Sequence, residues 1–162
     1  MEFSVVQRFA CSPETYWNRS RGPEFEAAVA KEAEALVEAL PSRQDGARLI
    51  ERSRVTLLQP LTAVAQKAMG VERFTYIQEV ETIDANFTTR WSIVPDVMKD
   101  RITIKGDTHV RGAQGGCERV IRGSIEVRIA LVGGTIERGI AERVQRGYTR
   151  AEPVIRRFVE GT

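Results

Sequence analysis

Five polar side chains occupy positions that the sequence pattern otherwise assigns to apolar faces, and they have the clearest capacity for binding chemistry. They are Tyr76, Gln78, Thr89, Thr108 and Tyr148. A buried polar group needs a hydrogen-bond partner, and the polar head of a bound molecule can provide one. The alternative is that these groups bond to one another or to a few waters. The pattern therefore indicates either a binding site or a polar patch within a core.

Apolar side chains at neighbouring positions of the same faces complete such a site. The full predicted ligand-binding set is Tyr76, Gln78, Thr89, Trp91, Ile104, Thr108, Ile125, Ile140, Val144 and Tyr148. Trp91 and Tyr148 are also common in ordinary cores, so neither indicates a ligand by itself. The prediction depends on the whole set lying around one cavity, which suits a mostly apolar ligand.

Groups suited to acid–base catalysis are few. His109 is the one histidine in the sequence, and it alternates with charged residues on the predicted solvent face of its strand. A surface histidine is expected there. Glu51 can point inward, but a solvated position at a sheet edge fits it better. The sequence has no nucleophile-elbow motif to support Ser-His-Asp catalysis. We therefore predict no catalytic residue.

The two cysteines, Cys11 and Cys117, lie in neither a CxxC motif nor a Cys/His cluster. This argues against a structural zinc site and against any bound metal. No cofactor-binding motif is present, and no cofactor is expected. The N-terminus has no basic and apolar segments like those of a signal peptide. These features together predict a cytoplasmic protein with both thiols free.

Composition limits the possible partners. The 162 residues carry 24 basic and 22 acidic side chains, for a net charge of +2. So small an excess gives no strong attraction to nucleic acid or to an anionic membrane surface. No run approaches the roughly 20 apolar residues of a membrane span, so no integral membrane association is expected. The length suits one domain over residues 1–162, and the oligomeric state stays open.

Alternation of apolar and polar residues predicts six strands. They cover residues 2–9, 48–58, 73–84, 87–94, 101–111 and 117–131. The last is the clearest, with Ile121, Gly123, Ile125, Val127, Ile129 and Leu131 on one side. That pattern is typical of an antiparallel strand with one wet face. Turns are expected at 41–46, 84–86 and 112–116.

Helical spacing predicts four helices, at residues 13–20, 25–40, 61–69 and 135–160. The last is about 39 Å long at 1.5 Å per residue. Pro153 lies within it and is expected to kink it near Thr149. The short helix at 61–69 follows Pro60 and ends at Gly70, so it can serve as a gate formed by Leu61, Val64 and Met69. A plain covering helix is the alternative.

The element order predicts an α+β fold: a curved antiparallel sheet of about six or seven strands around the C-terminal helix, with two short helices after the first strand. This order, with the Val132-Gly133-Gly134-Thr135-Ile136-Glu137 segment that begins the long helix, resembles the START-like or Bet v 1-like (SRPBCC) helix-grip superfamily. The Gly-Gly-x-Ile-Glu segment looks most like its uncharacterised bacterial DUF2505 branch. The glycine-rich loop of plant members has no counterpart here.

This resemblance implies a cavity between the sheet and the long helix. The first functional hypothesis is binding of a lipid, isoprenoid or polyketide-like molecule there, as a carrier or sensor. A second is a polyketide cyclase or dehydratase. The groups available to it for catalysis are Tyr, Thr and Gln side chains, with Glu51 or Arg90 as further candidates. A third is a partner-binding protein in which the cavity is incidental.

Overall fold

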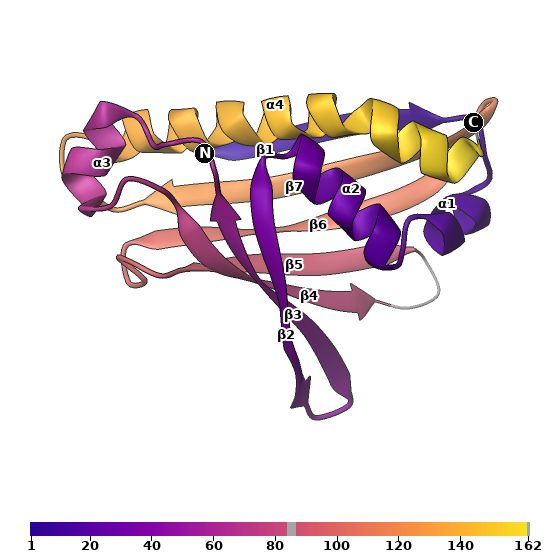
Figure 1. Cartoon of the computed structure of the whole chain (residues 1–162), viewed down its shortest axis with the longest axis horizontal. Coiled ribbons are helices and arrows are strands. Elements are labelled where there is room, and N and C mark those ends of the chain that lie inside the picture. The colour runs from indigo at the N-terminus through magenta and orange to yellow at the C-terminus, as the bar shows by residue number, and fades with distance from the viewer. Residues whose placement is uncertain (84–86, 162) are drawn as a thin grey trace.

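Four helices and seven strands make up the described part of the chain. The computed structural model describes residues 1–83 and 87–161. In chain order the elements are β1 (Glu2–Phe9), α1 (Pro13–Arg19), α2 (Pro23–Glu32), β2 (Ala35–Asp45), β3 (Arg48–Leu57), α3 (Ala63–Met69), β4 (Thr75–Ile83), β5 (Thr88–Pro95), β6 (Ile102–Ala113), β7 (Gly116–Val127) and α4 (Gly133–Glu160). Figure 1 shows α3 at one end of α4, and α1 and α2 at the other.

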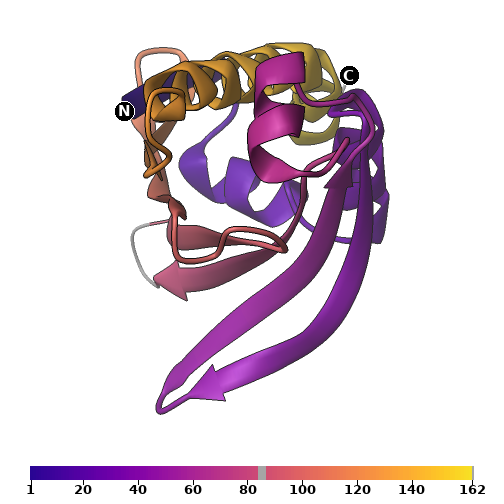
Figure 2. The ribbon, with the colours of Figure 1, turned by 90° about the vertical axis from the view of Figure 1, so that its left-hand side faces the viewer.

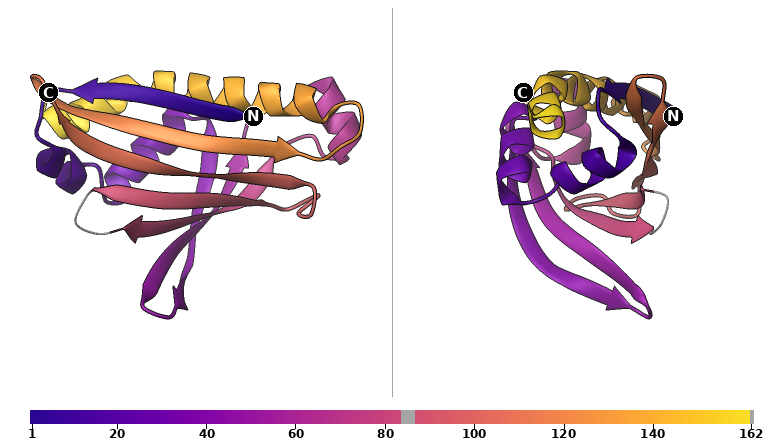
Figure 3. Two further views of the ribbon diagram at one scale, coloured as in Figure 1. Left: turned by 180° about the vertical axis from the view of Figure 1, so that it is seen from behind. Right: turned by 90° about the vertical axis from the view of Figure 1, so that its right-hand side faces the viewer.

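Within the described residues the strands form one antiparallel sheet in the order β1-β7-β6-β5-β4-β3-β2. Long strands twist as they pair, and the sheet curls beneath α4 (Figures 2 and 3). The β2–β3 hairpin extends away from the rest of the sheet. This architecture confirms the expected α+β helix-grip fold.

The Gly-Gly-x-Ile-Glu segment has a physical role at the start of α4. A side chain on Gly133 would collide with the carbonyl oxygen of Val127, so the helix can approach the end of β7 only with glycine there. Ile136 is buried in the core. Glu137 Oε1 accepts a hydrogen bond 2.9 Å long from the backbone N–H of Val127. The segment therefore joins the strand end to the helix through three separate contacts.

The expected helix at 25–40 is wrong in its second half, and the turn expected at 41–46 is wrong except at Gly46. Helix α2 ends at Glu32, and Glu34 adopts a positive φ of 52° that redirects the chain. Residues Ala35–Asp45 then form β2, which pairs with β3 and includes an irregularity between Leu40 and Arg43. Ala, Glu and Leu favour helices, but pairing along the exposed edge of β3 outweighs that local preference.

Two further boundaries differ from expectation. Strand β7 ends at Val127, so Ile129 and Leu131 lie outside it, and Leu131 is fully exposed with a φ of 69°. The turn expected at 112–116 is shorter, because β6 continues to Ala113 and β7 begins at Gly116. The turn expected at 84–86 lies outside the described residues.

Candidate functional site

The sheet has an inner face, turned toward α4, and an outer face. Strand registers place the predicted site residues of the sheet on the inner face. Trp91 pairs with Gly106, Thr89 with Thr108, and Ile104 with Ile125, while Gln78 pairs with Ile93. The sequence pattern thus assigned the correct face to these side chains. Ile104 and Ile125 are fully buried, and Trp91 is nearly so.

Helix α4 packs tightly on this face at its two ends and less tightly in its middle. Ile136 and Ala141 are buried in one cluster with Ile104, Ile125 and other apolar residues. Ala151, Val154, Ile155 and Val159 are buried in a second cluster near α1. Between them, Ile140, Val144 and Tyr148 contact the first cluster but are only half-buried. The stripe that the sequence assigned to ligand contact is therefore the less buried part of the helix's inner face.

Four of the five polar members of the predicted site make no side-chain hydrogen bond within the described residues. Tyr76, Gln78, Thr89 and Thr108 are half-buried on the inner face. Among residues 1–83 and 87–161 none of these side chains makes a hydrogen bond, so they do not satisfy one another. Desolvation raises the pKa of Tyr76, and the nearby Tyr148 adds to the rise, so the Tyr76 hydroxyl keeps its proton at neutral pH.

A polar seam separates the two apolar clusters, and the sequence reasoning missed half of it. We define the seam as Gln7, Thr108, Arg119 and Tyr148. Gln7 is 2% exposed and donates through Nε2 to the backbone oxygen of Tyr148 at 3.0 Å. Arg119 Nη1 donates to Gln7 Oε1 at 3.0 Å, and the Arg119 guanidinium carbon lies 5.3 Å from the centre of the Tyr148 ring.

The signal for Arg119 was present in the alternation of β7. Counting back by twos from Ile125 reaches Gly123, Ile121 and Arg119, so the arginine shares the phase of the buried isoleucines. In the structure Arg119 pairs with Gln7 on one side and Val110 on the other. A charged residue at a position that the alternation assigns to the buried face is a signal that can be recognised from the sequence alone.

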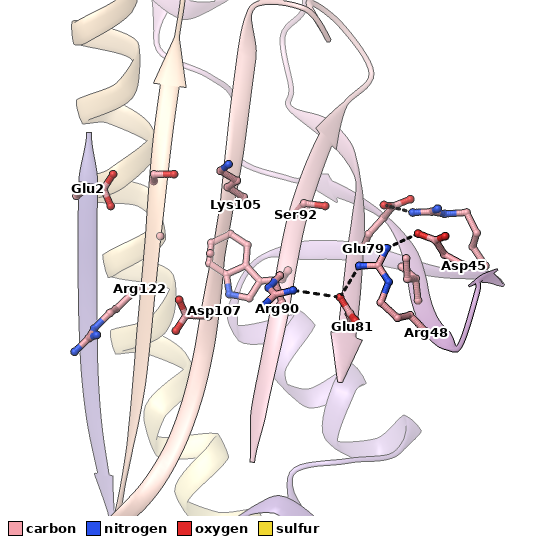
Figure 4. A pocket seen from close by; sticks show the side chains of 16 residues that line it. Glu2, Asp45, Arg48, Glu79, Glu81, Arg90, Ser92, Lys105, Asp107 and Arg122 are labelled. Carbon is pink, nitrogen blue, oxygen red and sulfur yellow. Dashed lines mark hydrogen bonds and ion pairs between the residues drawn. The ribbon is translucent and has the colours of Figure 1, made fainter. Parts of the chain in front are cut away.

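A hollow on the surface of the described residues lies elsewhere, on the outer face. It is a trough of about 670 Å³ that crosses β2 to β7 and is bounded by Glu2 at one edge (Figure 4). Of the predicted site residues only Trp91 borders it. Its charged lining consists of Arg43, Arg48, Arg90, Lys105 and Arg122 against Glu2, Asp45, Glu79, Glu81 and Asp107.

Charges in the trough balance, five against five. Several also pair directly: Arg43 with Glu79 at 3.1 Å, Arg48 with Glu81 at 3.5 Å, and Arg90 with Glu81 at 3.8 Å. Paired exposed charges produce little net field for a charged ligand. We therefore place the candidate site on the inner face rather than in the trough.

The residues considered for acid–base catalysis are not brought together. His109 Nδ1 lies 2.7 Å from Thr88 Oγ1, and His109 alternates out of phase with Thr108 and Val110 of the inner face. Glu51 is exposed on β3. Arg90 is exposed on the outer face, in the ion pair with Glu81. These three residues therefore do not form a matched acid and base.

The predicted gate residues lie at the α3 end of the molecule. Met69 is buried and Leu61 half-buried against the first apolar cluster, while Val64 is 44% exposed. Arg143 of α4 donates to the backbone oxygens of Gln59 and Pro60, at 3.3 and 2.6 Å. These two bonds attach the segment before α3 to the long helix. Movement of α3 as a gate stays a prediction.

Residues 1–83 and 87–161 have neither a membrane-spanning helix nor a cluster of metal-binding side chains. None of their helices combines the length and apolar character required to cross a bilayer. They also contain no group of three His, Cys, Asp or Glu side chains arranged for a metal ion. Both cysteines are free thiols, and burial raises the pKa of Cys117 to about 12, with neighbouring Cys11 adding to the rise.

Solved structures share this fold at low sequence identity. Protein TTHA0849 from Thermus thermophilus has a TM-score of 0.67 and 17% identity, covering 96% of this chain and 97% of its own. The Zhui aromatase/cyclase from Streptomyces sp. R1128 has a TM-score of 0.66 and 12% identity, covering 99% and 92%. Ara h 8.0201 has a TM-score of 0.63 and 12% identity, covering 96% and 97%.

These likenesses are of fold, and they confirm the START-like or Bet v 1-like helix-grip architecture. No curated protein matches the sequence closely. A family model described as "Protein of unknown function (DUF2505)" matches residues 4–159, almost the whole length. The chain therefore belongs to the DUF2505 family, as its glycine-glycine helix start indicated.

Proposed function

We propose that this protein binds a hydrophobic small molecule between the inner face of the sheet and the middle of α4, as a carrier or sensor. The observation that carries the proposal is the half-buried stripe of Ile140, Val144 and Tyr148, which faces polar side chains that make no hydrogen bond within the described residues. A cavity site of this kind is mostly apolar with a few placed polar groups. A lipid, isoprenoid or polyketide-like molecule has that character.

Energetics support the same assignment. A protein–ligand hydrogen bond replaces one to water, and its net contribution is roughly 0.5–1.5 kcal/mol. Tyr76, Gln78, Thr89 and Thr108 would each benefit from a ligand acceptor or donor. Covering the half-buried aliphatic side chains contributes a further roughly 25 cal/mol for each Å² of apolar surface removed from water. A ligand that does both would bind while leaving the two packed clusters unchanged.

The experiment uses the neutral dye Nile red, whose fluorescence rises in apolar surroundings, together with native mass spectrometry of protein isolated from its host. Wild type is expected to bind the dye and to carry a small molecule. Val144→Trp should fill the space and abolish dye binding. Val6→Trp, an exposed position on the outer face of β1, is the matched control and should bind normally.

The two measurements also define failure. Protein that neither binds Nile red nor carries a molecule from its host would overturn the proposal. So would a Val144→Trp variant that is destabilised by about 1–3 kcal/mol, because overpacking of that size means the space is already filled. A stable Val144→Trp variant with lost dye binding supports it.

An enzyme of the cyclase or dehydratase type is the second candidate. It is favoured by the fold shared with the Zhui aromatase/cyclase and by the raised pKa of Tyr76, which keeps a proton donor in the site. The Tyr76→Phe variant distinguishes the two functions. In an enzyme, it should still bind the ligand but lose turnover, whereas in a carrier it should change only the binding affinity. The cytoplasm remains the compartment we propose.

A further inference from the structure

Arg119 brings a positive charge to the inner side of the sheet, between the two apolar clusters. Its register partners Gln7 and Val110 are both buried. Its guanidinium is bound by Gln7 and lies over the ring of Tyr148 on α4. The charge also reaches α1, where it opposes the desolvation that raises the pKa of Tyr16. Elements on three sides therefore surround this arginine.

Arg119 has no acidic partner among residues 1–83 and 87–161. Every ion pair there joins a carboxylate to some other basic group. Gln7 accepts one hydrogen bond, from Nη1, and the Tyr148 ring contributes a cation–π contact. Arg119 is half-buried, so water solvates its charge only in part and a counter-charge would stabilise it. On the outer face, Arg43, Arg48 and Arg90 have carboxylate partners and Arg122 is exposed to solvent, whereas Arg119 is half-buried between apolar clusters. This difference points to a missing anion.

The chemistry of the position selects a carboxylate. A guanidinium has five N–H donors in a planar fork that fits the two oxygens of a carboxylate, and Gln7 uses only one of them. The Arg119 donors that Gln7 leaves free are not sealed from solvent, because none appears among the buried unpaired atoms of the described chain. A single guanidinium matches a single negative charge.

We infer that the ligand is an amphipathic carboxylic acid whose carboxylate binds Arg119 beside Tyr148, while its apolar part extends along Ile140 and Val144. This inference rests on the proposed function and specifies the class of ligand. Gln7 is a positioning residue, because it fixes the guanidinium and is itself held by the backbone of α4.

The test compares two probes that differ only at the end group, 11-(dansylamino)undecanoic acid and its uncharged methyl ester, by dansyl fluorescence at equal pH and salt. Wild type should bind the acid at least tenfold more tightly than the ester. Arg119→Met should abolish that preference and retain ester binding, and Arg119→Lys should restore part of it. Arg122→Met removes an arginine from the outer face of the same strand and should behave as wild type.

Each outcome bears on one claim. Equal affinity of wild type for acid and ester overturns the carboxylate inference and leaves the hydrophobic site intact. An acid preference that survives in Arg119→Met also overturns it, because another group then holds the anion. Failure of wild type to bind either probe, or Nile red, overturns the proposed function itself. If Arg119→Met fails to fold, the inference is tested by the ratio of acid to ester affinity in wild type and in Arg119→Lys.

Discussion

Gly106 lies directly opposite Gly123 across β6 and β7, and the Trp91 ring lies against both on the inner face. A side-chain carbon on Gly123 would come within 2.8 Å of Trp91 Cη2 and 2.5 Å of Phe3 Cζ. The rings of Phe3 and Trp91 have their centres 6.3 Å apart. The glycine pair therefore makes the space in which the indole lies flat on the sheet.

The first prediction concerns this pair. Gly106→Ala should destabilise the protein by about 1–3 kcal/mol, because the added methyl group meets the backbone of β7 as well as Trp91 Cζ2 at 2.5 Å. Gly123→Ala should cost less, because it meets aromatic side chains that can shift. Urea unfolding followed by tryptophan fluorescence measures both losses.

Gly112→Ala is the matched control on β6, because no atom lies within 4 Å of the position its methyl group would take. It should change stability by less than about 0.5 kcal/mol. If Gly106→Ala is as stable as this control, the indole does not pack against the glycines as described.

The second prediction concerns the unequal packing along α4. Ile136→Ala should cost about 2–5 kcal/mol, as expected for a buried isoleucine that is 4% exposed. Ile140→Ala, one turn later on the same stripe, should cost clearly less, because its side chain borders accessible space. Chemical unfolding of the two variants provides the comparison, and equal losses would mean that the interior is solid at Ile140.

The sequence predicted most of the fold because its strongest patterns are long. Alternation over β6 and β7 and the helical stripe of α4 each extend over many residues, so a local error leaves the assignment of faces unchanged. The segment after α2 is different. Its Ala, Glu and Leu residues favour a helix, and only pairing with a strand that comes later in the chain makes Ala35–Asp45 extended.

The same reasoning explains which parts of the candidate site were found. Thr89, Trp91, Thr108 and Ile125 follow from strand phase alone. Arg119 follows from the same phase, but its charge caused it to be overlooked. The association of Gln7 with Arg119 joins residues 112 positions apart, and no local pattern can predict such a pair before the strand order is known.

The third prediction concerns the hydrogen bond from the Val127 backbone to Glu137, whose side chain is 19% exposed. Glu137→Ala should destabilise the protein by about 1.5–3 kcal/mol, the usual range for a hydrogen bond to a charged group. Glu142→Ala on the same helix removes only an exposed pair with Arg146 at 3.9 Å and should cost less than about 0.5 kcal/mol. Thermal or urea unfolding measures the difference. Similar losses for the two variants would contradict a special role for Glu137.

The last prediction follows from the raised pKa of Tyr76. In the unfolded chain this hydroxyl ionises near its ordinary pKa of 10.0, whereas desolvation keeps it protonated in the folded protein at higher pH. The unfolded state therefore loses a proton first as pH rises. Stability is fully present below about pH 10 and falls as pH increases above it. Tyr76→Phe removes this contribution.

The free energy of unfolding of Tyr76→Phe, relative to wild type, should therefore improve between about pH 9 and pH 11, where groups common to both proteins cancel in the difference. Tyrosinate absorbance of the folded proteins provides an independent check. The difference between wild type and Tyr76→Phe is the signal of Tyr76 alone, and it should appear only above pH 10. If that signal titrates near pH 10 and the stability difference does not change with pH, then Tyr76 is solvated. A solvated hydroxyl would remain ready to bond water instead of a ligand, so this titration also tests the proposed environment of the inner face.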